Sequence, residues 1–465
     1  LLNSIYEAES VKTCMIYGRR RIGKTTLIER FVSDKPNINI EFDDSSSKIN
    51  LDIINNRISA FIGREVRTDS MRSSMDIIKD ICKERKMVIV FDELPYMTSN
   101  FSGGASEIQH LTDWVTRNTD SMIIIAGSSV SLMLDEVMRS DRPLYKRFMF
   151  TIDLGPLKIN DTRMIHRSMS DEDLMRTYLT LGGVSAYHRL VGDHSYKEMM
   201  NRYVLNRFGF IQSDVQMGIN LELGNRVTDV VSIFKAISGG DNTYGGIQNI
   251  SCLEDPVLQR DLDRMTVAGF IQKNDSMITS RRSKIYTISD PTTAFYYDVV
   301  DRNRSVLDTS DKDPYGSLEH IISTWLGKQF EVFCRDFIKE KYPCSEIGSW
   351  WGKAPLTKDG KVMKDEGGKV VTEDVDIDVV AVIRKGNDRV DLFGECKFTR
   401  EPMGFPVLND LQIRVDSLKG SFNKRLALFS VSGFSDRLRE YSEENGILLF
   451  DLDVLLGKKG LPELG

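Results

Sequence analysis

Cysteine, histidine and net positive charge are all scarce in this chain of 465 residues, and each shortage excludes a class of protein. The six cysteines show no Cys-x-x-Cys spacing and the five histidines are scattered, which argues against structural zinc and for reduced thiols. The formal net charge is −6, so nucleic-acid binding would require a local basic patch. The sequence has neither an apolar run of membrane-spanning length nor a visible signal peptide. We therefore expect a cytoplasmic protein with no membrane partner.

The length and composition are those of a multidomain globular protein. Hydrophobic residues make up 41% of the chain and charged residues 28%, which are ordinary values for a packed fold. A chain of this length holds about three or four domains, each with its own core. The sequence begins at Leu1 rather than at a methionine, and we expect an upstream segment to be missing.

The most informative stretch is Gly-Arg-Arg-Arg-Ile-Gly-Lys-Thr at residues 18–25, which fits the phosphate-binding pattern G-x-x-x-x-G-K-[ST]. In this pattern glycines let main-chain N–H groups approach a triphosphate, Lys24 reaches the β- and γ-phosphates, and Thr25 offers a hydroxyl to Mg²⁺. A β-leaning segment precedes it and a helix-forming segment follows, so the phosphates would face a helix N-terminus. The expected nucleotide-binding residues here are Gly18, Arg19, Arg20, Arg21, Ile22, Gly23, Lys24, Thr25 and Thr26.

A second motif lies where a nucleotide-hydrolysing domain requires one. The continuous apolar run at residues 87–91 is typical of a buried parallel strand, and it ends in Asp92 and Glu93. We expect Asp92 to hold Mg²⁺ through water and Glu93 to polarise the attacking water. A lone acidic pair after a strand is usually a solvated strand end. Together with the phosphate-binding loop, it predicts Mg²⁺-dependent hydrolysis of ATP.

The N-terminal section alternates predicted strands with predicted helices, which indicates a parallel sheet covered on both faces. Ligands of such sheets bind at the carboxyl ends of the strands. Ser128 would lie there beside Lys24, Asp92 and Glu93. Either Ser128 or Ser129 is a candidate sensor of the γ-phosphate, and the alternative is that these serines cap the next helix. Arg147 is our candidate for an arginine that accelerates hydrolysis, and the alternative is a solvated loop arginine.

The middle of the chain predicts two smaller units. A helical lid is followed by helices and then a hairpin, which is the order of a winged helix. Arg281, Arg282 and Lys284 would lie at the tip of the hairpin, where they suit contacts with phosphates. The alternative is a winged helix used only for protein packing.

The C-terminal section carries a second set of residues suited to metal chemistry. Asp378 and Glu395 lie on two strands predicted to be neighbours, and Lys397 shares a face with Glu395 because side chains alternate along a strand. Facing carboxylates can hold Mg²⁺ or Mn²⁺, and a lysine can orient or deprotonate the attacking water. Helices on either side offer Glu331 and Gln412. The alternative is a coincidence or an inert descendant of such a site.

With these residues in view, the chain resembles the prokaryotic, archaeal-type P-loop ATPases related to AAA+ and STAND proteins. The matching segments include the phosphate-binding loop, the strand that ends in Asp92, and residues 126–131 and 182–187. Asp378 with Glu395-Cys-Lys397 is similar to the PD-(D/E)xK pattern of restriction-endonuclease-like nucleases. Ser185 stands where these ATPases usually have a proline.

The resemblance implies an α/β protein with a P-loop ATPase core at 1–155, a helical lid at 156–224, a winged helix at 225–310 and a restriction-endonuclease-like domain at 311–465. It implies an ATPase whose nucleotide state controls a metal-dependent endodeoxyribonuclease, with ATP and DNA as partners. Self-association would follow if Arg147 acted on a neighbouring copy. The alternative is a STAND-like switch whose C-terminal domain binds DNA or a protein without catalysis.

Overall fold

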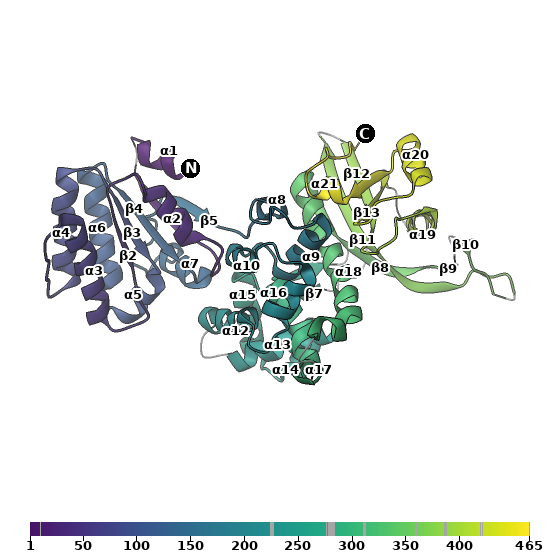
Figure 1. Cartoon of the computed structure of the whole chain (residues 1–465), viewed down its shortest axis with the longest axis horizontal. Coiled ribbons are helices and arrows are strands. Elements are labelled where there is room, and N and C mark those ends of the chain that lie inside the picture. The colour runs from purple at the N-terminus through teal and green to yellow at the C-terminus, as the bar shows by residue number, and fades with distance from the viewer. Residues whose placement is uncertain are drawn as a thin grey trace. The chain divides into compact units, whose positions relative to one another are not determined.

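The structure of the protein is a computed structural model (Figure 1). The described residues are 1–9, 11–223, 227–275, 277, 284–309, 313–358, 361–365, 367–385, 388–418, 420 and 422–464. The chain forms two compact units. Unit 1 consists of Leu1–Leu157, Val184–Tyr187 and Gly218–Asn225, and unit 2 consists of Lys158–Gly183, His188–Met217 and Arg226–Gly465.

Unit 1 is built on a five-stranded parallel sheet with the order β2-β3-β4-β1-β5. The strands are β1 (Thr13–Tyr17), β2 (Asn37–Glu41), β3 (Val88–Asp92), β4 (Met122–Gly127) and β5 (Phe150–Asp153). The central strands β3 and β4 are buried along their whole length, as their continuous apolar sequences require in a sheet covered on both faces. This arrangement confirms the predicted α/β class.

Helices cover both faces of this sheet, and alternate strand residues supply the two cores. Ile89 and Phe91 pack into the cluster that faces α3 to α7, whereas Val88 and Val90 pack into the cluster that faces α1 and α2. The helices are α1 (Leu2–Glu7), α2 (Lys24–Val32), α3 (Ser47–Ile62), α4 (Met71–Glu84), α5 (Leu94–Asn100), α6 (Gly104–Asn118) and α7 (Val130–Met138). The carboxyl ends of β1, β3 and β4 consequently meet at one edge.

Unit 2 opens with helices that follow the nucleotide-binding section. These are α8 (Ile159–Thr162), α9 (Asp171–Leu181), α10 (Ser185–Val191), α11 (Tyr196–Met199), η1 (Met200–Val204) and α12 (Phe210–Leu223), of which α10 and α12 lie partly in unit 1. Three helices and an antiparallel hairpin come next, in the order expected of a winged helix: α13 (Val227–Gly239), α14 (Tyr244–Ser251), α15 (Asp255–Val267), β6 (Ile271–Asp275) and β7 (Lys284–Ile288). Lys284 is exposed, and Arg281 and Arg282 lie outside the described residues.

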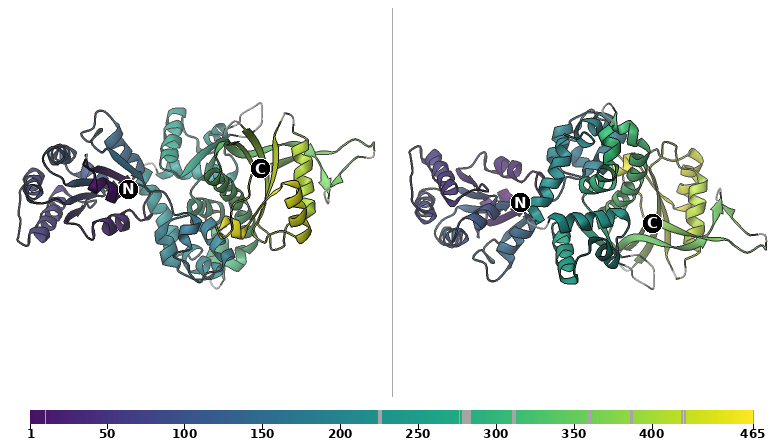
Figure 2. Two further views of the ribbon diagram at one scale, coloured as in Figure 1. Left: turned by 90° about the horizontal axis from the view of Figure 1, so that it is seen from above. Right: turned by 90° about the horizontal axis from the view of Figure 1, so that it is seen from below.

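The C-terminal part of unit 2 is a mixed sheet with the order β14-β13-β12-β11-β8. Its strands are β8 (Cys344–Pro355), β11 (Thr372–Lys385), β12 (Asp388–Lys397), β13 (Lys424–Ser430) and β14 (Leu448–Asp451). Strands β8, β11 and β12 pair antiparallel, and β12, β13 and β14 pair parallel. The ends of β8 and β11 extend beyond the other strands and lead to β9 (Thr357–Lys358) and β10 (Lys361–Val362), as Figure 2 also shows.

Further helices join and flank these parts. They are α16 (Pro291–Phe295), η3 (Tyr296–Val300), η4 (Asp301–Asn303), α17 (Arg304–Thr309), α18 (Pro314–Lys341), α19 (Phe405–Asp416), α20 (Asp436–Asn445) and α21 (Leu452–Leu455). The long helix α18 precedes the mixed sheet and packs against β8, β11 and β12. A search of the described helices finds none with the length and apolar character needed to cross a membrane.

The core of unit 1 makes a testable prediction on helix α3. Ile54 is 0% exposed and belongs to the core cluster, whereas Ile49 on the same helix is 48% exposed. Ile54→Ala should lower the free energy of unfolding by about 2–5 kcal/mol, because it removes buried methyl groups and leaves a cavity. Ile49→Ala is the matched control and should change it by less than about 1 kcal/mol. Urea unfolding of the full chain measures both, and equal losses would contradict the packing described.

Candidate active site

The loop between β1 and α2 has the backbone of a phosphate cradle. Gly18 has φ +152°, and a Cβ added there would lie 2.3 Å from the carbonyl oxygen of Leu154. Gly23 and Arg21 have φ +111° and 66°, in the left-handed region. Helix α2 begins at Lys24 with no acidic residue in its first turn, so its N–H groups and its dipole suit a phosphate. The residues present therefore fit ATP.

Lys24 lies inside this loop. Its side chain is 5% exposed, and Nζ donates hydrogen bonds to the carbonyl oxygens of Gly18 at 2.8 Å and Arg19 at 3.0 Å. These two main-chain carbonyls hold the amine of Lys24 at the loop. Arg20 and Thr26 are exposed and Ile22 is buried.

The structure brings Thr25 and Asp92 together across the sheet edge. The Thr25 hydroxyl donates to Asp92 Oδ2 at 3.1 Å, and Asp92 is 1% exposed. The other carboxylate oxygen of Asp92 accepts the N–H of Glu93 at 2.9 Å. A threonine hydroxyl beside an aspartate is the oxygen pair that holds Mg²⁺ in P-loop NTPases, so this donor set fits that metal.

Glu93 and Ser128 also meet at this edge. Glu93 has φ 51°, and its Oε2 accepts hydrogen bonds from the Ser128 N–H at 3.1 Å and from the Ser128 hydroxyl at 2.8 Å. Ser128 therefore holds the carboxylate that the sequence nominates as the catalytic base. Its role as a sensor of the γ-phosphate stays a prediction.

The sequence reasoning overlooked Glu41, which ends β2 at the same edge. Partial burial and the nearby carboxylates of Asp92 and Glu93 raise its pKa. The sequence did contain a signal for Glu41, because the second predicted strand of the parallel sheet also has its carboxyl end at this edge. Negative charge is thus concentrated beside the phosphate-binding loop, where a divalent cation would neutralise it.

Arg147 does not lie at this edge of the sheet in its own chain. Its guanidinium pairs with Asp113 on α6, with Nε to Oδ1 at 3.1 Å. Its carbonyl oxygen accepts from Thr13, the first residue of β1, at 2.8 Å. The phosphate-binding loop follows the other end of β1, about 13 Å away for a strand of this length. Action on a neighbouring copy stays a prediction.

The second set of predicted residues converges in unit 2, on α18, β11 and β12. Asp378 and Glu395 are buried, and Asp378 Oδ2 accepts the N–H of Cys396 at 2.7 Å. Burial, followed by the neighbouring carboxylates of Glu395 and Glu331, raises the pKa of Asp378 to about 8. Burial raises the pKa of Glu331 to about 7, with Asp376 and Glu395 adding to the effect. Carboxyl groups so close together retain protons near neutral pH.

Cationic side chains compensate Glu395. Lys397 Nζ lies 2.7 Å from Glu395 Oε1, and Arg414 Nη1 lies 3.1 Å from Oε2. Gln412 was predicted at this site, but its exposed side chain pairs with Asp416 instead. Gln412 and Arg414 are two positions apart on helix α19, so their side chains lie on different faces of the helix. It is Arg414 that contacts Glu395.

In the second cluster, cationic side chains and a main-chain N–H group contact the carboxylate oxygens. Among the residues that the structure describes, no three His, Cys, Asp or Glu side chains are grouped so that they could hold a metal ion. Both oxygens of Glu395 are taken by cations, and one oxygen of Asp378 is taken by an N–H group. The predicted metal role of Glu331, Asp378 and Glu395 stays a prediction.

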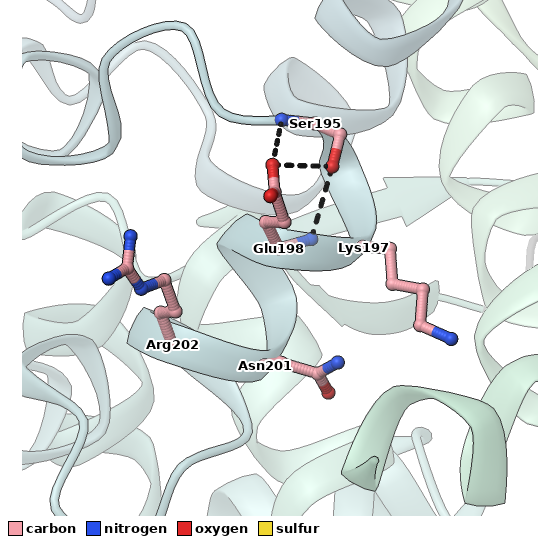
Figure 3. Close-up of a pocket in the computed structure, with 5 residues that line it drawn as sticks. All are labelled: Ser195, Lys197, Glu198, Asn201 and Arg202. Carbon is pink, nitrogen blue, oxygen red and sulfur yellow. Dashed lines mark hydrogen bonds between the residues drawn. The ribbon is translucent and has the colours of Figure 1, made fainter.

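A polar pocket of about 500 Å³ lies elsewhere in unit 2 (Figure 3). It is lined by Ser195, Lys197, Glu198, Asn201 and Arg202. These side chains have partners within the protein: Ser195 and Glu198 bond each other, and Lys197 and Asn201 both donate to Asp313. We assign no ligand to this pocket.

A parallel sheet with a phosphate-binding loop after β1 and a Thr25–Asp92 pair defines a P-loop ATPase. Residues 1–187 match a family described as an ATPase domain predominantly from Archaea, and residues 296–407 match one described as archaeal and bacterial proteins of unknown function. The match of residues 1–187 confirms the resemblance to archaeal ATPases in that part of the chain.

Similar proteins cover most of the chain. An uncharacterised protein of Methanocaldococcus jannaschii is 24% identical over 470 residues, 97% of each chain. The solved Walker-type ATPase of Pyrococcus abyssi has a TM-score of 0.50 at 19% identity, over 62% of this chain and 91% of that one. The ORC2 protein of Aeropyrum pernix has a TM-score of 0.41 at 13% identity, over 66% of this chain and 91% of that one. The likeness to the Pyrococcus protein shows the fold of the part of the chain that it covers. The predicted nuclease-like domain at 311–465 stays a prediction.

The phosphate-binding loop predicts the effect of removing its amine. Lys24→Ala should weaken ATP binding by a factor of about 100 or more, because it removes the buried cation that would face the phosphates. Lys48→Ala, at an exposed position on α3, should leave binding unchanged. Equilibrium titration with a fluorescent ATP analogue measures both, and equal affinities would contradict the assignment.

Proposed function

We propose that the protein binds ATP with Mg²⁺ and hydrolyses it at the loop of unit 1. The observation that carries this proposal is the contact between Thr25 and Asp92, with Glu93 beside it, at the carboxyl edge of the sheet. The match of residues 1–187 to an ATPase family supports it independently. The loop, the hydroxyl, the aspartate and the glutamate each supply a different part of the chemistry.

We assign each residue a role that suits its position. The loop N–H groups and Lys24 would bind the phosphates, and Thr25 with Asp92 would hold Mg²⁺. When bound, Mg²⁺ neutralises charge that develops on the phosphate oxygens. Glu93 would orient the attacking water and accept its proton. The Ser128 N–H and hydroxyl both donate to Oε2 of Glu93, so they orient the carboxylate.

The role proposed for Glu93 predicts that its substitution changes ATP hydrolysis but not ATP binding. Glu93→Gln should keep ATP affinity within about twofold and slow hydrolysis by about 10²–10⁴-fold, because the amide cannot accept the proton. Glu84→Gln, at an exposed position on α4, is the matched control. Phosphate release at saturating ATP measures the effect. Wild-type turnover in Glu93→Gln would remove Glu93 from the proposed mechanism.

Hydrolysis would require self-association only if Arg147 acted on a nucleotide bound to a neighbouring copy. Its partner Asp113 would have to release the guanidinium before Arg147 could reach a nucleotide on a neighbouring copy. The hydrolysis rate per protomer would then rise with protein concentration. A rate that is constant from the monomer to the oligomer would exclude this role.

A second candidate function is cleavage of DNA at the carboxylate cluster of unit 2, controlled by the nucleotide state. It is favoured by the convergence of Glu331, Asp378, Glu395 and Lys397. The competing proposal is a STAND-like switch with an inactive C-terminal domain. The pairing of Glu395 with both Lys397 and Arg414 favours that reading.

The charge of helix α15 bears on where DNA would bind. Helix α15 occupies the position of a recognition helix, and its sequence holds three aspartates and two arginines. A helix without excess positive charge is a poor partner for phosphates. DNA binding, if it occurs, would depend on other surfaces of unit 2.

Cleavage assays separate the two candidates. Linear, circular and single-stranded DNA would be incubated with Mg²⁺ or Mn²⁺, with and without ATP. If the cluster is a nuclease, Asp378→Asn should abolish cleavage and Asp374→Asn, exposed on the same strand, should retain it. ATP hydrolysis without cleavage by the wild type under every condition would select the switch.

A further inference from the structure

A short segment that follows helix α9 supports the phosphate-binding loop. Val184–Tyr187 packs with unit 1, although the residues before and after it belong to unit 2. The Ser185 hydroxyl donates to the carbonyl oxygen of Arg21 at 3.1 Å, and the Ala186 N–H donates to the same oxygen at 3.2 Å. Ser185 is separated from Arg21 by 164 positions in the sequence. Two donors thus hold one carbonyl of the loop.

The loop needs these donors for a physical reason. When N–H groups turn inward toward a phosphate, the carbonyl oxygens of the same peptides turn outward, and each needs a donor of its own. Lys24 serves the carbonyls of Gly18 and Arg19. Ser185 and Ala186 serve the carbonyl of Arg21, whose left-handed backbone must be held by its surroundings.

The position of Ser185 is specific to this part of the loop. The side chain is 7% exposed, and its Oγ would lie 3.3 Å from a Cβ built on Gly23. Ser185 therefore lies against Arg21 and Gly23, two of the left-handed positions of the loop, which come shortly before Lys24.

Buried hydrogen bonds fix the chain on either side of the segment. His188 Nε2 bonds the carbonyl oxygen of Gly182 at 2.7 Å, and His188 Nδ1 bonds His166 Nε2 at 2.7 Å. The Thr292 hydroxyl donates to the carbonyl oxygen of Leu181 at 3.1 Å. The residues that flank the segment, Gly182 and His188, are therefore held by hydrogen bonds within unit 2.

We propose that Ser185 is a positioning residue for the ATPase reaction. Its hydroxyl holds the Arg21 carbonyl outward, which keeps the loop N–H groups aimed at the phosphates before and during hydrolysis. The inference rests on the proposed ATPase function.

Ser185→Ala tests the proposal. Loss of one neutral hydrogen bond should raise the dissociation constant and the KM for ATP by about 3- to 10-fold. The value of kcat should stay within about twofold, because the support is needed equally in the ground state and the transition state. Ser185→Thr keeps the hydroxyl and should restore wild-type affinity. Ser33→Ala removes an exposed hydroxyl on the same unit, one that donates to the Arg30 carbonyl, and is the matched control.

A second readout does not depend on catalysis. Hydrogen exchange of the Ala186 amide, which donates to Arg21, should slow on ATP binding in the wild type and slow less in Ser185→Ala. A purely structural role would lower the active fraction, and hence kcat, without changing the KM. Equal ATP affinity and exchange in Ser185→Ala and wild type would overturn the proposal, as would equal defects in the Ala and Thr variants. Failure of the ATPase proposal is distinct, because the wild type would then bind ATP without turnover.

Discussion

The structure of unit 1 depends on one constraint, the main-chain geometry of residues 18–25. N–H groups can face a phosphate only if the backbone turns through left-handed positions, and Gly18, Arg21 and Gly23 adopt them. That turn leaves outward carbonyls, which Lys24 and the Ser185 segment satisfy. The buried strand β1 leads into the loop and α2 leads out of it, so the sheet order places Asp92 and Glu93 beside it.

The two acidic clusters of the chain balance their charge in different ways. In unit 1, Asp92 and Glu93 accept from neutral groups, namely a threonine hydroxyl, a serine hydroxyl and main-chain N–H groups. Such donors leave most of the negative charge in place, which suits a divalent cation with a nucleotide. In unit 2, Glu395 is paired with two cationic side chains, and the pKa of Asp378 is raised to about 8. That cluster is compensated within the protein itself.

Much of unit 1 could be predicted from the sequence, because its signals are local. The phosphate-binding pattern and the apolar runs of β3 and β4 each lie within a few residues, and the parallel sheet follows from their alternation with helices. Contacts between distant residues could not be predicted. Arg147 pairs with Asp113 at the far edge of the sheet, and Arg414 rather than Gln412 reaches Glu395. The support from Ser185 depends on a fold that returns to the loop after a long excursion.

Thr25, Asp92 and Glu93 form the proposed site for Mg²⁺-dependent hydrolysis of ATP. Its most direct test is the release of phosphate from ATP by the purified full chain as a function of Mg²⁺ concentration. The account predicts turnover that is absent in EDTA, rises with Mg²⁺ and saturates. ATP binding without phosphate release at any Mg²⁺ concentration would contradict it.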